Sequence, residues 1–324
     1  MLLLYTLAVF VSALLLFSVQ PHVGKVLLPV MGGTPAVWNT CMLFFQAALL
    51  LGYGYTHVTS KWLDVKKQGV LHLLLMGAAF AFIPVTVSMS SQWSASPTWP
   101  LLVALTTSVG LPFVVNSTTA PLLQRWFSTT DHARAHNPYP LYASSNAGSL
   151  LALLAYPLVI ERTLSLHEQS LAHGWVFGLL AVLVAACLGA AWTRQMPADA
   201  ISEPTPAPSW GLRLRWLVMA FVPSSLLLGV TMALTLDVAA VPMLWVVPLA
   251  LYILSFVLAF SHRHPPHAPI VAWFPIGVVA LIPMLITRVS TPIVGVALAH
   301  LVVFFAACMA FHGELNRTKP TLRT

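Results

Sequence analysis

The sequence has very little charge for its length. Asp, Glu, Lys and Arg make up 7% of its 324 residues, whereas a soluble globular domain has about 25%. Hydrophobic residues make up 58%, and the mean hydropathy is +0.85. So few charges could not cover the one or two cores that a soluble chain of this length would have. The composition excludes a soluble enzyme, a disordered chain and a nucleic-acid-binding protein. It predicts an integral membrane protein, which has the lipid bilayer as a partner.

Cysteine is scarce, and the common catalytic motifs are missing. Cys41, Cys187 and Cys308 lie in separate apolar runs without a Cys-x-x-Cys motif, which gives no support to a disulfide framework or a thiolate metal site. We expect each thiol to be packed in the core. There is no Walker lysine loop, no Gly-x-Gly-x-x-Gly after a strand, no His-Glu-x-x-His and no Gly-x-Ser-x-Gly. We therefore expect no enzymatic activity and no cofactor.

Long apolar runs dominate what is present. A membrane-spanning helix needs about 20 such residues, and ten segments reach this length, some only just: 2–19, 36–57, 70–89, 99–122, 140–160, 172–193, 214–235, 239–260, 268–287 and 291–311. The sequence thus predicts an all-α, polytopic membrane helix bundle of about ten transmembrane helices. No Lys or Arg precedes the first segment and no Ala-x-Ala-like site follows it, which favours an uncleaved first span over a signal peptide.

The distribution of cations predicts how this bundle is oriented. Lys and Arg in short loops stay on the cytoplasmic side of a membrane. With ten spans and a cytoplasmic N-terminus, all but three of the 15 Lys and Arg residues fall in inner loops or the C-terminal tail; the exceptions are Lys25, Arg162 and Arg288. We therefore expect both termini to be cytoplasmic.

A polar, proline-rich segment divides the predicted spans into six and four. Its Pro, Ser, Glu and Asp residues cannot bury enough surface to fold. The predicted organisation is a six-helix membrane half at 1–193, a cytoplasmic linker at 194–212, a four-helix membrane half at 213–312 and a cytoplasmic tail at 313–324.

The 6 + 4 division is compatible with a truncated parallel repeat of the major-facilitator type. Pro35-Ala36-Val37-Trp38 and Pro242-Met243-Leu244-Trp245 open corresponding helices of the two halves. Pro is favoured in the first turn of a helix in any protein. Because the match is only four residues long, descent and coincidence both account for it.

Polar residues gather in the spans 99–122 and 140–160. Polar groups are costly in hydrocarbon and usually face a cavity or a neighbouring helix. Both clusters lie within about 15 Å of the loop between the spans, by helix rise, so they could line one pocket in the cytoplasmic half. Small residues that let helices approach closely would give the same pattern, and the two interpretations can coexist. The candidate pocket residues are Asn116, Ser117, Thr118, Thr119, Ser144, Ser145, Asn146 and Ser149.

Two charges mark the outer side of the predicted bundle. Lys25 follows the first span and Asp237 follows the seventh, which are corresponding places if the halves repeat. Their opposite signs suggest an ion pair that gates or braces the outer side. The alternative is that each charge reaches headgroups or water independently.

The sequence contains 12 histidines, which raises the question of a metal or haem. His262, His264 and His267 place three imidazoles on a short inner loop and are weak metal candidates. The stiff Pro-Pro between them and the lack of a partner carboxylate favour a solvated loop. His300 lies deep in the last span, as a proton carrier or as a core histidine bonded to a neighbouring helix. We expect no bound metal.

Several longer stretches resemble a known family: Gln20-Pro21-His22-Val23-Gly24-Lys25, Gly32-Gly33-Thr34-Pro35-Ala36-Val37-Trp38, Thr119-Ala120-Pro121-Leu122-Leu123-Gln124-Arg125-Trp126-Phe127 and His312-Gly313-Glu314-Leu315. They resemble the membrane portion of the bacterial fused major-facilitator/spermidine-synthase proteins, over nearly the whole chain. The resemblance implies a bacterial inner-membrane location. In that family, further spans and a soluble aminopropyltransferase-like domain follow. The glycine-rich turn and acidic base of that domain are missing here, so no synthase activity is expected.

The sequence leaves two functions open. The first is a transporter-like bundle of unknown substrate, with a polar pocket and two halves that rock. The alternative is a non-catalytic membrane subunit or scaffold, which docks a separate soluble aminopropyltransferase-like enzyme on its cytoplasmic face or joins a larger membrane complex. The polar clusters favour the first function, and the shorter second half favours the second. A polycationic substrate is not expected, because no carboxylate lies at a span centre.

Overall fold

Helix forms at each of the ten predicted apolar segments. The computed structural model of the chain describes residues 1–32, 34–83, 98–135, 139–193, 208–235, 244–260, 265–287 and 293–318. In these residues the protein is all-α, without a β-strand. It divides into two compact units, unit 1 at Met1–Ile201 and unit 2 at Ser202–Thr324. The boundary falls within the segment 194–212, of which residues 194–207 lie outside the described ones.

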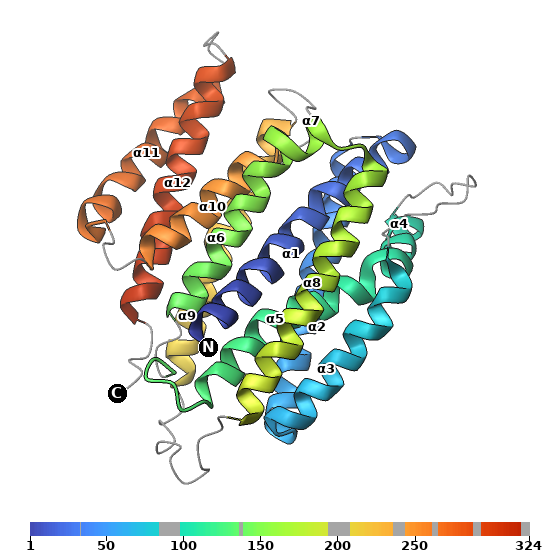
Figure 1. The fold of residues 1–324 in the computed structure, drawn as a ribbon. Helices are drawn as coiled ribbons and strands as arrows, with labels where there is room; N and C mark the ends of the chain where they lie inside the picture. The colour runs from blue at the N-terminus through green and yellow to red at the C-terminus, as the bar shows by residue number, and fades with distance from the viewer. Residues whose placement is uncertain are drawn as a thin grey trace. The chain divides into compact units, whose positions relative to one another are not determined.

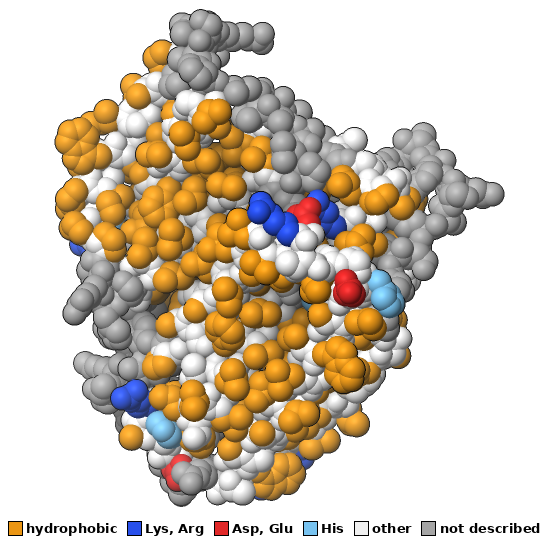
Figure 2. Space-filling model, turned by 45° about the horizontal axis from the view of Figure 1, so that its top comes forward, with side chains coloured by type: hydrophobic (Ala, Val, Ile, Leu, Met, Phe, Trp, Pro, Cys, Tyr) orange, Lys and Arg blue, Asp and Glu red, His pale blue; other side chains and the backbone are white. Residues whose placement is uncertain are grey.

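Seven helices in the described residues are long and apolar enough to cross a membrane: Leu2–Met31, Ala36–Trp62, Thr98–Ser128, Pro140–Thr163, Leu166–Thr193, Trp210–Ala233 and Val294–Thr318. Val246–Ala259 and His267–Pro283 are apolar but shorter. Figure 2 shows one face of the molecule, on which hydrophobic side chains predominate and charged ones are few. This bundle is compatible with an integral membrane protein. The count of about ten spans and the orientation of the termini stay predictions.

Unit 1 contains the helices α1 (Leu2–Met31), α2 (Pro35–Trp62), α3 (Val65–Ala79), η1 (Phe80–Phe82), α4 (Thr98–Leu105), η2 (Thr106–Gly110), α5 (Leu111–Ser128), α6 (Tyr139–Ala155), η3 (Tyr156–Ile160), α7 (Glu161–Thr163) and α8 (Leu166–Thr193). Local signals set some of the starts. The Asp64 carboxylate caps α3 by accepting from the Lys67 N–H at 2.7 Å. Ser165 and Glu168 form a reciprocal capping box at the start of α8.

The first helix is longer than the sequence predicts. The predicted span ends at residue 19, before Gln20-Pro21-His22, but α1 continues to Met31 with Pro21 and Pro29 inside it. Proline is tolerated in membrane helices because neighbouring helices and polar side chains can satisfy the freed backbone groups. The extension makes His22 and Lys25 part of the helix instead of a loop, and this change matters for the site.

The long helix α1 is the centre of unit 1. It packs against α5, α6 and α8, and Figure 1 shows it, in dark blue, between α6 and α8. The contact with α6 is very close: a Cβ on Gly148 would lie 2.5 Å from the backbone oxygen of Phe10. At the end of α1 where the chain begins, Tyr5 packs on Phe127 of α5 with ring centroids 5.3 Å apart. The N-terminus of α1 therefore lies beside the C-terminus of α5.

Two short π-helical segments interrupt unit 1, η2 before α5 and η3 after α6. A proline follows the start of each irregularity, Pro112 just after η2 and Pro157 within η3. A proline ring clashes with the carbonyl four residues earlier and removes an N–H, so it disfavours regular α-helix at that place. Segments of this kind are frequent at functional sites.

Unit 2 contains α9 (Trp210–Ala233), α10 (Val246–Ala259), α11 (His267–Thr287) and α12 (Ile293–Thr318). The other three helices all pack against α12. Hydrogen bonds join the end of α12 to the start of α9, through Trp216 Nε1 and the Thr318 oxygen, and to the end of α10, through Asn316 Nδ2 and the Ala259 oxygen. His267, at the start of α11, lies 2.9 Å from the Ala310 oxygen near the same end of α12. Consecutive helices of unit 2 therefore alternate in direction, as consecutive membrane spans must.

Candidate functional site

Polar side chains buried among apolar helices need hydrogen-bond partners, because an unpaired polar group in such surroundings costs free energy. In unit 1 these groups are not scattered. Ser18, His22 and Lys25, spaced four and three residues apart, share one face of α1. His22 is fully buried and Ser18 is buried. Lys25 forms an ion pair with Glu161 of α7 at the end of this row.

A second histidine, His173 of α8, faces this row and pairs with His22. The rings of His22 and His173 lie with centroids 4.9 Å apart. Gln169, also buried, joins them: its Oε1 lies 3.1 Å from His22 Nδ1, and its backbone oxygen lies 2.6 Å from His173 Nδ1. The Tyr156 hydroxyl, in the π-helical segment η3, donates to the same Oε1 at 2.7 Å. Residues from α1, η3 and α8 thus meet at one buried point.

The hydrogen bonds determine where the protons of this pair lie. Amide oxygens only accept, so Nδ1 donates in both His22 and His173. The Gln169 Nε2 donates to the Leu164 oxygen at 2.9 Å, which fixes the amide orientation. The Nε2 of His22 then carries a lone pair and no hydrogen. This buried atom has no hydrogen-bond partner among the described residues. It is the atom of His22 that a further proton would occupy.

The single hydroxyl proton of Ser18 can be donated to either of two acceptors. Its Oγ lies 3.1 Å from the Leu15 oxygen and 3.1 Å from His173 Nε2. When His173 is neutral, the hydroxyl can donate to Nε2. When His173 carries a second proton on Nε2, that N–H can donate to Oγ while the hydroxyl turns to Leu15. The contact therefore accommodates both protonation states of His173 by a rotation of one hydroxyl.

A second buried histidine lies nearer the N-terminus of α1. The Nε2 of His72, on α3, lies 3.1 Å from Thr119 Oγ1, and its Nδ1 lies 3.3 Å from Thr118 Oγ1. Both threonine hydroxyls are also within hydrogen-bonding distance of the Val115 oxygen, at 2.7 and 3.2 Å. One threonine can therefore donate to His72 while the other accepts from it, and the two can exchange these roles. Either neutral tautomer of His72 is satisfied.

Between the two histidine groups, α1 and α5 are joined by a reciprocal pair of hydrogen bonds. The Ser12 hydroxyl donates to Asn116 Oδ1 at 2.9 Å, and Asn116 Nδ2 donates to the Ser12 backbone oxygen at 3.2 Å. A small cavity lined by both Asn116 and His173 adjoins them, in which the centre of a water-sized sphere has about 20 Å³ of space. That volume suits about one water; it is far too small for a metabolite.

Gln68 of α3 is fully buried, at the end of unit 1 where the N-terminus of α1 lies. Its Oε1 accepts from Arg125 at 2.7 Å and from the indole N–H of Trp126 at 2.9 Å. A second guanidinium nitrogen of Arg125 donates to the Ser60 oxygen at 2.7 Å. Arg125 is only part-buried there, and this end of unit 1 also carries Lys61.

These groups follow one another through the core of unit 1, and we call them the polar column. Helix rise from Arg125 to Asn116 and from Ser12 to Lys25 sums to about 30 Å, the thickness of a bilayer's hydrocarbon core. A charged group, Arg125 or the Lys25–Glu161 pair, stands at each end. The members of the polar column are Gln68, His72, Thr118, Thr119, Asn116, Ser12, Ser18, His173, His22, Gln169 and Tyr156.

Only part of the predicted pocket belongs to the polar column. Asn116, Thr118 and Thr119 do, whereas Ser117 donates to the Val114 oxygen of its own helix. The residues predicted on α6 meet α1 elsewhere: Ser144 donates to the Thr6 oxygen at 2.8 Å.

The remaining α6 residues fit the interpretation that small residues allow close packing. Ser149 is buried and donates to the Ser145 oxygen of its own helix, while Ser145 and Asn146 are half-buried. The cavity beside Asn116 is lined by residues of α1, η2, α5 and α8 and by Ile83, which follows η1, without a residue of α6. The two predicted clusters therefore lie against different sides of α1.

The other predicted residues are placed as follows. Lys25 pairs with Glu161, whereas Asp237 lies outside the described residues, so the Lys25–Asp237 pair stays a prediction. His262 and His264 also lie outside them, and the part of the chain that the structure describes contains no group of three metal-ligating side chains. His300 bonds the Val296 oxygen of its own helix at 2.8 Å. The three cysteines are buried and unpaired, as predicted.

Sequence reasoning missed the histidines of the polar column. His22 lies beyond residue 19, where the first predicted span ends, and His72, although inside the predicted span 70–89, is not among the predicted site residues. The available signal was the periodicity of Ser18, His22 and Lys25, which continues the helix through Pro21.

Comparison with protein-family models, with curated proteins and with solved structures finds no match. The resemblance of the sequence to the fused major-facilitator/spermidine-synthase proteins stays an expectation. The candidate site rests on its own geometry.

Proposed function

We propose that the protein is a transporter-like, multi-pass membrane protein whose polar column carries protons. The observation that carries this proposal is the contact of the fully buried His22 with the part-buried His173, which leaves one imidazole nitrogen of His22 without a hydrogen-bond partner among the described residues. Ionisable residues inside membrane spans are costly and are functional by default. Histidine is the side chain best suited to take up and release protons near neutral pH.

The order of the groups supports a path rather than a single site. A proton arriving from the Lys25–Glu161 end can bind His22 Nε2, while Nδ1–H stays bonded to Gln169. His22 and His173 do not both stay charged, because like charges at this distance repel. The proton then passes to His173, whose contact with Ser18 accommodates both states. The water-sized cavity leads on to Asn116, and the exchangeable tautomers of His72 continue the path toward Gln68.

The bundle gives little room for a substrate within unit 1, since the cavity of the polar column holds about one water. A transported solute would therefore need another conformation, as alternating access requires. The proposal therefore specifies only a class of function, which is solute movement linked to protons. It names no substrate, coupling stoichiometry or direction of transport.

A flux assay in liposomes tests the proposal. Purified protein is reconstituted with a pH-sensitive dye inside, and proton entry is followed after an imposed gradient, with and without polyamines, amino acids and common metabolites outside. We expect proton entry that His22→Gln and His173→Gln reduce at least tenfold. His57→Gln, which alters an exposed histidine of α2 in the same unit, should leave it unchanged.

The alternative function gives a different result. If the protein is a non-catalytic membrane subunit or scaffold, the polar column only braces the bundle. The wild-type protein would then show no proton flux with any solute. His22→Gln and His173→Gln would lower only the unfolding temperature, and a stoichiometric partner would co-purify with the protein.

A further inference from the structure

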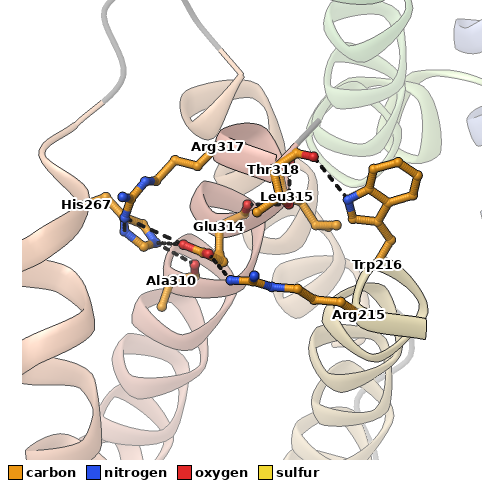
Figure 3. A network of polar contacts seen from close by, with 8 residues as sticks. All are labelled: Arg215, Trp216, His267, Ala310, Glu314, Leu315, Arg317 and Thr318. Carbon is orange, nitrogen blue, oxygen red and sulfur yellow. Dashed lines mark hydrogen bonds and ion pairs between the residues drawn. The ribbon is translucent and has the colours of Figure 1, made fainter. Parts of the chain in front are cut away.

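One end of unit 2 carries a group of charged and polar side chains that the polar column does not use. Glu314 of α12 is its centre: one carboxylate oxygen lies 2.5 Å from Arg215 of α9, and the other lies 3.6 Å from Arg317 and 3.9 Å from His267 Nε2 of α11. Figure 3 shows these side chains converging on Glu314 from three helices. We call Arg215, His267, Glu314 and Arg317 the basic cluster.

The hydrogen bonds of His267 fix the charge of the basic cluster. Nε2 lies 2.9 Å from the Ala310 oxygen, which only accepts, so Nε2 carries a hydrogen. Nδ1 lies 3.3 Å from a guanidinium nitrogen of Arg317, which only donates, so Nδ1 accepts. The neutral tautomer with a hydrogen on Nε2 satisfies both contacts. Two arginines against one glutamate leave a net charge of +1.

The surplus positive charge is accessible. The side chain of Arg317 is 66% exposed and that of Arg215 is 52% exposed, whereas Glu314 is 21% exposed. Glu314 is already shared by both guanidinium groups, so it offers no free carboxylate to a further cation. The basic cluster is thus suited to one more anion, and it is not suited to a second positive group.

An apolar groove of about 500 Å³ begins beside the basic cluster. Its volume is within the range of about 300–1,000 Å³ that is typical of ligand pockets. Pro265 and Pro269, on either side of His267, line this end of the groove, and Gly277 and Val302 line it further along α11 and α12. Between them Trp273 and Phe274 add aromatic surface. Every residue that lines the groove is apolar.

We propose that this groove and the basic cluster together bind an anionic phospholipid of the bilayer. One acyl chain lies in the groove between α11 and α12, and the phosphate lies at Arg317. Basic groups at the membrane-facing end of helices are a recurrent means of binding anionic headgroups. A zwitterionic lipid fits less well, because its terminal ammonium would meet Arg317 and Arg215 without a free carboxylate.

The packing of α11 on α12 holds the headgroup site in place. A Cβ on Gly313 would overlap the ring of His267, so this glycine lets the ring approach α12 closely. In that position His267, which lies between the groove-lining Pro265 and Pro269 in the sequence, accepts from Arg317. Loss of the close contact between His267 and Gly313 would separate the charge of Arg317 from the groove.

Lipid binding to the purified full-length protein tests the proposal. Native mass spectrometry and the thermal unfolding midpoint in detergent are measured with added phosphatidylglycerol, phosphatidylcholine or glycerol phosphate. We expect phosphatidylglycerol to bind and to raise the midpoint, phosphatidylcholine to bind at least tenfold more weakly, and glycerol phosphate, which lacks acyl chains, to have no effect.

Two pairs of variants separate the headgroup from the chain. Arg317→Gln should weaken phosphatidylglycerol binding by about tenfold, the factor expected for one lost charge-assisted contact, and abolish the preference over phosphatidylcholine. Its control is Arg213→Gln, an exposed arginine of α9 that lies over Trp210 outside the cluster. Ala306→Trp fills the groove and should weaken both lipids, whereas Val294→Trp, outside the groove on α12, should weaken neither.

Three results would overturn the proposal. They are equal binding of the two lipids by the wild-type protein, a headgroup preference that survives Arg317→Gln, and unchanged lipid binding by Ala306→Trp. Each variant is first shown to unfold cooperatively without added lipid. The proposal does not depend on proton transport, because it concerns residues of unit 2 only.

Discussion

Gln169 shows how much of the candidate site depends on a single side chain. Its Oε1 accepts from Tyr156 and His22, and its Nε2 donates to the Leu164 oxygen. The residue is 2% exposed, so no water replaces a lost partner. Two of its partners come from different helices, which means that the orientation of one amide sets the tautomer of His22 and the position of the Tyr156 hydroxyl.

We predict that Gln169→Leu destabilises the protein by about 1–3 kcal/mol, because it leaves His22 Nδ1 and the Tyr156 hydroxyl buried without their acceptor. The midpoint of denaturant unfolding in detergent measures this. Gln46→Leu, at an exposed position of α2, is the matched control and should change the midpoint little. Equal effects of the two substitutions would show that the Gln169 hydrogen bonds contribute nothing measurable.

At the scale of elements, the position of α1 is what assembles the polar column. α1 meets α5 through Ser12 and Asn116, α8 through His22 and Gln169, and α6 through the close contact at Gly148. Without a hydrophobic driving force between helices in lipid, such contacts depend on small residues and interhelical hydrogen bonds. The small residues of α6 therefore position α1, although they contribute no group to the column.

We predict that Gly148→Ala destabilises unit 1 by about 1–3 kcal/mol, the usual cost of overpacking. The new Cβ would lie 2.5 Å from a backbone oxygen, which cannot move aside as a flexible side chain can. Gly189→Ala on α8, where a Cβ meets nothing within 4 Å, should be neutral or stabilising by up to about 1 kcal/mol because of helix propensity. The thermal unfolding midpoints of both variants are measured in detergent. A Gly148→Ala midpoint as high as that of the wild-type protein would contradict the close approach of α6 to α1.

At the scale of the whole molecule, the ends of unit 1 differ in charge. Lys61, Lys66, Lys67 and Arg125 lie at the end near the N-terminus of α1, whereas the opposite end has Lys25 paired with Glu161 and the exposed Arg162. The positive-inside rule concerns cations near the ends of spans. The end with more cations is therefore expected to face the cytoplasm.

We predict that a membrane-impermeant maleimide labels Thr163→Cys in intact cells and labels Ser128→Cys only after the membrane is permeabilised. Both positions are exposed, and they lie at opposite ends of unit 1. The native cysteines give a low background because all three are buried. The reverse labelling pattern would overturn the predicted orientation, and labelling of both positions in intact cells would show that this part of the chain does not cross the membrane as expected.

The sequence by itself determined the class of the protein and the position of its helices. Hydrophobicity and its run lengths are local properties, so an all-α bundle with a helix at each predicted segment followed from them, as did the burial of Cys41, Cys187 and Cys308. The end of the first helix was not predicted, because Pro21 is a breaking signal in water and a tolerated residue in a packed bundle.

Only the tertiary structure decided which polar side chains meet. Ser12 and Asn116 are separated by 104 residues, and His22 and Gln169 by 147, so no periodicity or spacing along the chain relates them. The same is true of Arg215 and Glu314 in unit 2, which are separated by 99 residues. Hydrogen bonds and ion pairs are short-ranged and directional, and the packing of helices alone brings their partners within reach.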